Sequence, residues 1–203
     1  IDKLICASNK NKVLFDFFQT GTYDKNREFV LTTSPSMDIL ISSNLERLIY
    51  LIAGEDSEKT RELMEELKDS GSYTITEDMK EKLSDFASGY SDEAETAESI
   101  RENYEKTGYV IDTHTAVAAH VCEQYRIKTG DAKKCVIAST ASPYKFVKSV
   151  MTAIDEKYAD AEEKYELNDP DFKATPVHVY ENFYRNEEED HDNDGTSDGT
   201  VRV

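Results

Sequence analysis

The chain has 203 residues, 38% of them hydrophobic, and a formal net charge of −18 at pH 7. This strong negative charge argues against a nucleic-acid partner or an anionic membrane surface, because both require clustered Lys and Arg. No run approaches the ~18 consecutive apolar residues that a membrane-spanning helix needs. A small anionic substrate stays compatible with the charge, because backbone N–H groups and a few cations can bind it locally.

The cysteines and the first residues of the chain give information about the cellular compartment of the protein. Cys6, Cys122 and Cys135 are widely spaced and form no CxxC pair. An odd number of such cysteines is typical of reduced, buried thiols rather than a disulfide framework or a zinc site. The chain begins at Ile1 with no Met and no signal-peptide pattern. We therefore expect a cytoplasmic protein.

Residues 1–54 are predicted to be one segment of an α/β core. An apolar run at 4–7 is typical of a short strand, and the apolar spacing that follows it predicts a helix that ends near Gly21. The pattern Ser43-Asn44-Leu45-Glu46 is a capping box, which predicts a second helix with Ser43 as its N-cap.

Residues 55–107 are rich in acidic side chains and carry apolar residues at helical spacing. Three helix faces are predicted, lined by Leu63, Met64 and Leu67, by Met79, Leu83 and Phe86, and by Ile100 and Tyr104. The acidic residues are expected to be solvated helix surface without chemistry. We therefore predict a helical insertion over about 55–107.

Residues 108–185 return to the α/β pattern as a second core segment. The apolar run at 109–113 leads into a helix rich in small residues, and Cys135-Val136-Ile137 is predicted to be a short buried strand. A further helix is predicted around 146–154. The alternation of short strands with helices predicts an α/β architecture.

The turn at 138–143 is the most informative stretch. A hydroxyl-rich turn between a strand and a helix is where open α/β sheets bind ligands, which makes Thr140 a candidate ligand-facing side chain. Ser142 and Pro143 also form a good helix start, with Ser142 as N-cap. The two interpretations are compatible, because Ser142 can cap the helix while Thr140 faces a ligand.

Asp112 and His114 are a second candidate for chemistry. They are either an acid/base pair or a carboxylate and a histidine satisfied at a helix start. The spacing alone leaves both interpretations open.

Residues 186–203 are acidic and predicted to be disordered. Asp190, Asp192, Asp194 and Asp198 lie in a glycine-containing loop with oxygen ligands at alternate positions, as Ca²⁺ prefers. An EF-hand requires Glu at position twelve, where Val201 stands. The tail is therefore either a calcium-binding loop or a solvated segment.

Five segments together resemble the threonine synthase family in order and spacing. They read ICASNKN at 5–11, GTYD at 21–24, TSPSMDILISSNLERL at 33–48, HTAV at 114–117 and STASPYKF at 139–146. The resemblance extends from residue 1 to about residue 155. It implies a fold-type-II pyridoxal phosphate (PLP) enzyme, tryptophan synthase β-like, of which this chain corresponds to the C-terminal part.

The resemblance also implies an activity, the conversion of O-phospho-L-homoserine and water into L-threonine and phosphate. The family's Schiff-base lysine and phosphate-binding loop lie in the N-terminal half, so the missing N-terminal half is the expected partner and the isolated chain is expected to be inactive. Thr140 matches the family hydroxyl that meets the pyridine nitrogen of PLP. Asp112 and His114 match a segment that borders the active site, in which Thr113 stands where the family has proline.

Two alternative interpretations fit the same residues. One is a non-catalytic structural or interaction fragment with a calcium-binding acidic tail. The other is a related fold-type-II enzyme such as a threonine dehydratase, although the SPSMDI block at 34–39 and the helical insertion favour threonine synthase. Because an isolated C-terminal part exposes the surface that the other half covers, we also expect weak stability or self-association.

Overall fold

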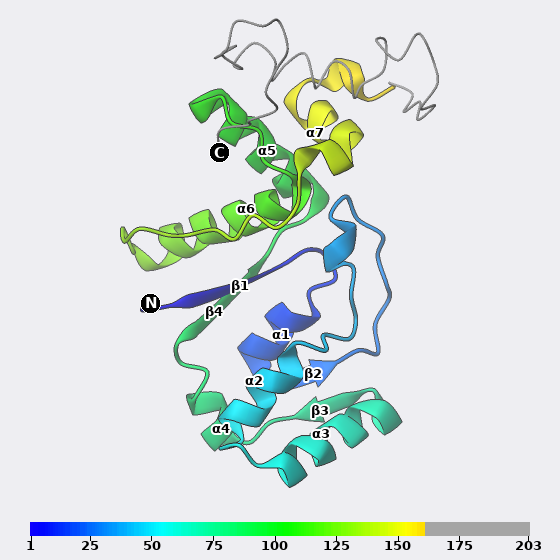
Figure 1. The fold of residues 1–203 in the computed structure, drawn as a ribbon, viewed down its shortest axis with the longest axis vertical. Helices are drawn as coiled ribbons and strands as arrows, with labels where there is room; N and C mark the ends of the chain where they lie inside the picture. Colours follow the sequence, from blue (N-terminus) through cyan, green and yellow to red (C-terminus); the bar gives the residue numbers. More distant parts are fainter. Residues whose placement is uncertain (161–203) are drawn as a thin grey trace, which may run out of the picture.

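The computed structural model describes residues 1–160, which fold into strands and helices (Figure 1). In chain order the elements are β1 (Leu4–Ser8), α1 (Val13–Thr20), β2 (Thr22–Asp24), η1 (Pro35–Met37), α2 (Leu45–Ile52), α3 (Ser57–Ser70), β3 (Ser72–Thr74), α4 (Glu77–Glu81), β4 (Phe86–Tyr90), α5 (Glu93–Thr107), α6 (Thr113–Thr129), η2 (Pro143–Phe146), α7 (Val147–Ile154) and η3 (Glu156–Tyr158). The predicted first strand and the helix that ends at Gly21 are confirmed.

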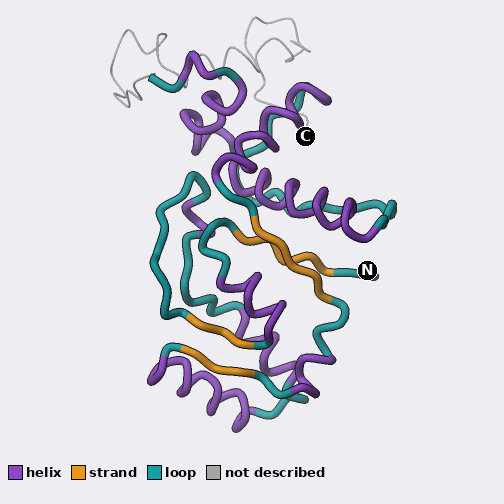
Figure 2. The backbone as a smooth tube through the Cα atoms, turned by 180° about the vertical axis from the view of Figure 1, so that it is seen from behind, coloured by secondary structure: helices purple, strands orange, loops and turns teal. Residues whose placement is uncertain are grey.

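The strands form two separate pairs (Figure 2). β1 runs parallel to β4, with Leu4 opposite Phe86 and Ser8 opposite Tyr90. β2 runs antiparallel to β3. Helices α1 and α6 lie on either side of the parallel pair, as expected for parallel strands, whose two faces are normally covered (Figure 1).

α6 packs close to β4 because Gly89 has no side chain. A Cβ atom at this position would lie 2.7 Å from Cγ1 of Val121, closer than real Cβ contacts allow. This close contact sets how near the middle of α6 comes to β4.

Two hydrophobic clusters support the fold. The larger cluster contains side chains from the helices α1, α2, α3 and α4 and from the β2–β3 pair. It includes the stacked rings of Tyr23 and Tyr73, whose centroids lie 5.4 Å apart. The smaller one joins α5, the start of α6, and α7. Its fully buried members include Ile100, Val147 and Val150.

The predicted capping box at Ser43 is wrong. The residue that precedes α2 is Asn44, whose backbone is already helical, and its side chain caps no backbone N–H. The Leu45 N–H donates to the carbonyl oxygen of Ser42, so the chain enters the helix through a turn. An N-cap needs an extended backbone, and Ser43 lies inside this turn instead.

The segment 55–107, predicted as a helical insertion, contains the strands β3 and β4 besides its helices α3, α4 and α5. The apolar spacing through Met79, Leu83 and Phe86 does not continue as one helix: α4 ends at Glu81, and Phe86 begins β4. Leu63, Met79 and Leu83 share the larger core with α1 and α2. The division of the chain at residues 54, 107 and 185 stays a prediction.

The buried strand predicted at Cys135-Val136-Ile137 is wrong as well. The segment 131–142 contains no strand, and the side chain of Val136 is 93% exposed. A strand requires a neighbouring strand for its N–H and C=O groups, and none within residues 1–160 pairs with this segment.

Within the part of the chain that the structure describes, no helix has the length and apolarity to cross a bilayer. The acidic tail at 186–203 lies outside the described residues, and so do the candidate calcium ligands Asp190, Asp192, Asp194 and Asp198.

Candidate functional site

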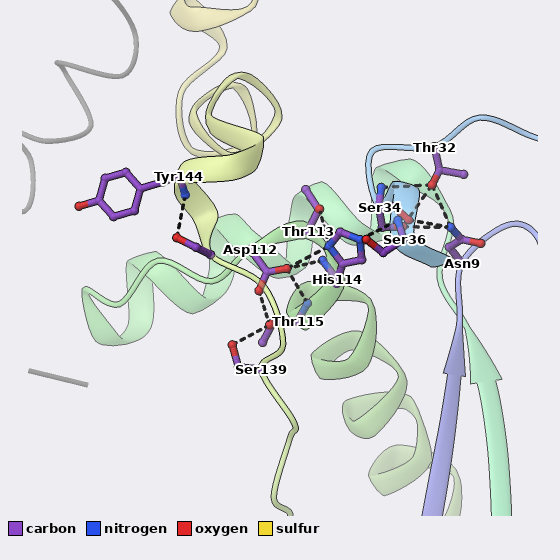
Figure 3. Close-up of polar contacts among 11 residues, drawn as sticks. Asn9, Thr32, Ser34, Ser36, Asp112, Thr113, His114, Thr115, Ser139 and Tyr144 are labelled. Atoms are coloured by element: carbon purple, nitrogen blue, oxygen red, sulfur yellow. Dashed lines mark hydrogen bonds and ion pairs between the residues drawn. The ribbon is translucent and has the colours of Figure 1, made fainter. Parts of the chain in front are cut away.

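Polar side chains from separate parts of the chain meet where β1 ends and α6 begins (Figure 3). One group follows β1 directly. A second lies on the loop 30–38, and a third is at the start of α6, where the segment 131–142 also approaches it. The carboxyl end of a parallel strand pair is the edge at which α/β proteins commonly bind ligands.

Two asparagines after β1 hold the loop 30–38 in place. The side-chain N–H groups of Asn9, which is 1% exposed, donate to Asp38 Oδ1 at 2.7 Å and to Thr32 Oγ1 at 2.9 Å. Asn11 forms paired hydrogen bonds with the backbone of Val30, and its Nδ2 also donates to Asp38 at 2.9 Å. Buried amides with satisfied donors and acceptors fix a loop far more firmly than exposed ones do.

Asp38, at the end of this loop, binds Thr32 near the start of the loop. Its carboxylate accepts hydrogen bonds from the Thr32 N–H at 3.0 Å and from the Thr32 hydroxyl at 2.7 Å, besides those from the two asparagines. The sequence patterns do not predict a role in the site for Asn9, Asn11 or Asp38. The pattern that could have pointed to the two asparagines is their spacing, with one residue between them, directly after a predicted strand.

Asp112 caps the start of α6. Its Oδ1 accepts from the backbone N–H of His114 at 2.8 Å and of Thr115 at 3.3 Å, and the Thr115 hydroxyl donates to its Oδ2. Burial by itself raises the pKa of this carboxyl, but the hydrogen bonds from His114 and Thr115 outweigh it and hold the pKa below the usual value.

His114 connects α6 to the loop 30–38. Its Nδ1 lies 3.2 Å from Asp112 Oδ1, and its Nε2 lies 3.1 Å from the Ser36 nitrogen. Because the Ser36 N–H donates, Nε2 accepts, and the ring proton sits on Nδ1 and points to Asp112. Both ring nitrogens are therefore occupied, which favours a histidine that positions the loop over one that exchanges a proton with a substrate.

The segment 131–142 reaches the same place through Ser139. The hydroxyl groups of Ser139 and Thr115 lie 3.0 Å apart. The neighbouring residue, Thr140, is exposed, and no group among residues 1–160 forms a hydrogen bond with its hydroxyl. Ser142 accepts from the Tyr144 N–H at 3.3 Å, so the predicted cap is confirmed, although the first turn is a 3₁₀ helix.

The structure thus brings Asp112 and His114 together, and Ser139 links them to the segment that carries Thr140. No three His, Cys, Asp or Glu side chains gather into a metal site anywhere in residues 1–160.

Residues 115–187 match the family model "Threonine synthase, C-terminal". The chain is 42% identical over 156 residues to threonine synthase-like 1 of Homo sapiens, an alignment that covers 76% of this chain and 21% of that protein. It is 34% identical over 183 residues to threonine synthase of Corynebacterium glutamicum, covering 87% of this chain and 38% of that protein.

Solved structures agree with these relatives. PLP-bound threonine synthase from Brucella melitensis matches with a TM-score of 0.70 and 40% identity, over 75% of this chain and 32% of that one. The yeast threonine synthase structure matches with a TM-score of 0.70 and 34% identity, over 76% and 33%. The chain spans about a fifth of the human relative and about a third of these threonine synthases.

Proposed function

Because this chain belongs, over the part that it spans, to the threonine synthase family, we propose that it forms the C-terminal part of a PLP-dependent enzyme. The proposed reaction is the conversion of O-phospho-L-homoserine and water into L-threonine and phosphate. The family and the α/β fold class predicted from the sequence are both confirmed by the matches to solved threonine synthases.

The observation that supports this proposal most strongly is the exposed Thr140 hydroxyl beside the polar site. A neutral hydroxyl with no partner among the described residues fits the pyridine nitrogen of PLP, which needs a single hydrogen-bonding group. When bound, PLP supplies an electron-withdrawing ring that stabilises negative charge on substrate carbon atoms. Thr140 gives that nitrogen a neutral partner, where a carboxylate would favour its protonation.

Asp112 and His114 are proposed as positioning residues. Asp112 orients the His114 ring and caps α6, and His114 accepts the Ser36 N–H. Through these contacts the two residues set the distance between α6 and the loop 30–38. That loop and the Thr140 segment then form two sides of the substrate site.

The remaining machinery is assigned to the part of the family that this chain does not span. We infer that the PLP lysine and the phosphate-binding loop lie there, and that the N-terminal half is the direct partner of this chain. The exposed apolar side chains of Leu31, Val136 and Tyr109 fit a surface that such a partner covers.

The test compares Thr140→Ala with Thr140→Ser in the complete enzyme. We expect Thr140→Ala to lower kcat/KM for phosphate release about tenfold, the equivalent of one hydrogen bond, and to shift the PLP absorption band. Thr140→Ser keeps the hydroxyl and should retain both activity and spectrum. Equal activity and spectra in all three proteins would remove Thr140 from the site, and no phosphate release from O-phosphohomoserine by the wild type would overturn the proposed reaction.

A further inference from the structure

Two cysteines that are 13 positions apart in the sequence meet beside α6. The Sγ atoms of Cys122, on α6, and Cys135, on the segment 131–142, lie 2.8 Å apart. The spacing of the cysteines in the sequence predicts separate, buried thiols. The structure shows instead that Cys122 is 6% exposed, that Cys135 is exposed, and that the two sulfurs are in contact.

The chain returns along α6 by a defined turn. α6 ends at Gly130, whose φ of 72° lets the backbone reverse direction. The Asp131 carboxylate accepts the Lys133 N–H at 2.9 Å, and the Arg126 guanidinium donates to the Lys133 carbonyl at 2.8 Å. These contacts place Cys135 over the helix turn that carries Cys122, so their proximity comes from local structure.

The two thiols differ in accessibility in a way that suits stepwise oxidation. Cys135 is open to solvent and to a small oxidant. Burial, together with the neighbouring Cys135 thiol, raises the pKa of Cys122 to about 11. Burial also raises the pKa of Cys6 to about 11, but no other sulfur among the described residues contacts Cys6. Cys6 is therefore a natural internal control.

We propose that Cys122 and Cys135 form an intramolecular disulfide when the chain meets a small disulfide oxidant such as oxidised glutathione. The Cys135 thiolate attacks one sulfur of the oxidant, which forms a mixed disulfide and releases one glutathione thiol. Cys122 then gives up its proton and attacks the Cys135 sulfur, which releases the second glutathione. The chain loses two protons and two electrons, and one oxidised glutathione becomes two reduced molecules.

This pair stands apart from the proposed reaction but lies close to its site. Cys135 comes four residues before Ser139, whose hydroxyl contacts Thr115. Oxidation therefore ties the segment 131–142 to α6 covalently at one point, beside the hydrogen bond that ties it at another. The structure assigns this pair as an oxidative modification site that restrains the segment carrying Thr140.

The experiment equilibrates the purified 203-residue chain in glutathione buffers of increasing oxidised fraction, followed by alkylation and intact-mass analysis. We expect the number of free thiols to fall from three to one, with Cys6 as the remaining thiol. Trypsin cleaves between the two cysteines at Arg126, Lys128, Lys133 and Lys134, and the peptides that carry Cys122 and Cys135 should stay joined until a reductant is added.

Variants make the assignment specific. Cys135→Ser changes an exposed side chain, so the chain should fold, and it should form no internal disulfide. Cys6→Ser is the matched control and should form the disulfide as the wild type does. Three free thiols throughout, a persistent glutathione adduct at Cys135, or a disulfide that contains Cys6 would each overturn the proposal.

Discussion

The loop 30–38 and the segment 131–142 both lack α-helix and strand, yet they are held in opposite ways. The loop is fixed by hydrogen bonds that Asn9, Asn11 and Thr32 donate and that the Asp38 carboxylate accepts. The segment 131–142 exposes Val136 and reaches the site through the contact of Ser139 with Thr115. The polar groups of the loop find their partners within this chain, whereas the segment 131–142 exposes the apolar side chains of Val136 and Ile137. The lack of helix or strand therefore does not show that a segment is flexible. The number of hydrogen bonds that hold the segment is the better guide.

The largest effect is expected from removing the side-chain N–H groups of Asn9, which lies after β1 and donates to the loop 30–38. Asn9→Asp replaces the amide N–H groups that face Asp38 with a second carboxylate. We expect a loss of about 3 kcal/mol in the free energy of unfolding, from an unsatisfied buried group and like-charge repulsion. Urea denaturation measures it. The loss should shrink as pH falls and one of the two carboxyls takes up a proton.

Asn9→Ala separates the two causes. It removes the hydrogen bonds without adding charge, so it should be less destabilising than Asn9→Asp at neutral pH and should show no extra pH dependence. Equal destabilisation by both variants at all pH values would mean that repulsion from Asp38 has no part in the effect.

The second prediction concerns Asp112, which connects the two regions through His114 and Thr115. Asp112→Asn should cost about 2 kcal/mol at pH 7, since a buried charge-assisted cap is lost. The pKa of Asp112 is lower in the folded chain than its ordinary value of 3.8. The stabilisation is therefore fully present above that value and disappears as pH falls through the lower, folded pKa.

Acid unfolding of wild type and Asp112→Asn, followed side by side, measures this difference. The two free energies of unfolding should converge as the pH falls below 3.8. A constant difference across the whole pH range would show that the carboxylate charge does not contribute.

A smaller effect is expected at the contact that holds the segment 131–142. Ser139→Ala removes one hydroxyl pair and leaves the Thr115–Asp112 contact intact, so we expect a loss of about 1 kcal/mol or less. Hydrogen exchange should become faster at 136–140 and stay unchanged in the loop 30–38. Faster exchange in both regions would show that they are not independent.

The smallest effect on stability is expected at Val136, an exposed side chain of the segment 131–142. Val136→Asp changes a side chain that is almost fully exposed, so the free energy of unfolding of the isolated chain should change by less than about 0.5 kcal/mol. Self-association of the isolated chain, measured by sedimentation, should fall. Val147→Ala, at a fully buried valine, is the matched control and should cost about 2 kcal/mol.

Sequence patterns located the features that depend on neighbouring residues. The strand at 4–8, the helix that ends at Gly21 and the cap at Ser142 follow from local spacing and from residue preferences at helix ends. The parallel pairing of β1 with β4 escaped prediction, because nothing in either sequence records the position of the other strand. The apolar pattern through Phe86 suits both a helix face and a strand, and only the partner strand decides between them.

In the candidate site, too, contacts between residues that are close in the sequence are predictable and contacts between distant residues are not. Asp112 and His114 are two residues apart in the chain, so the sequence predicts their association and leaves open only whether they take part in chemistry or position the loop. The hydrogen bond from the Ser36 N–H to Nε2 of His114 joins residues 78 positions apart, so local sequence patterns cannot predict it. Nor do they predict the meeting of Cys122 and Cys135, since the strand expected at 135–137 would have hidden the thiol that the structure exposes.

The parallel pairing of β1 with β4 also has a consequence for biosynthesis. The two strands lie about 80 residues apart in the chain. At translation rates of roughly 5–20 residues per second, β1 leaves the ribosome about 4–16 seconds before its partner. During that interval its apolar residues and its open backbone edge are available to chaperones and to other nascent chains.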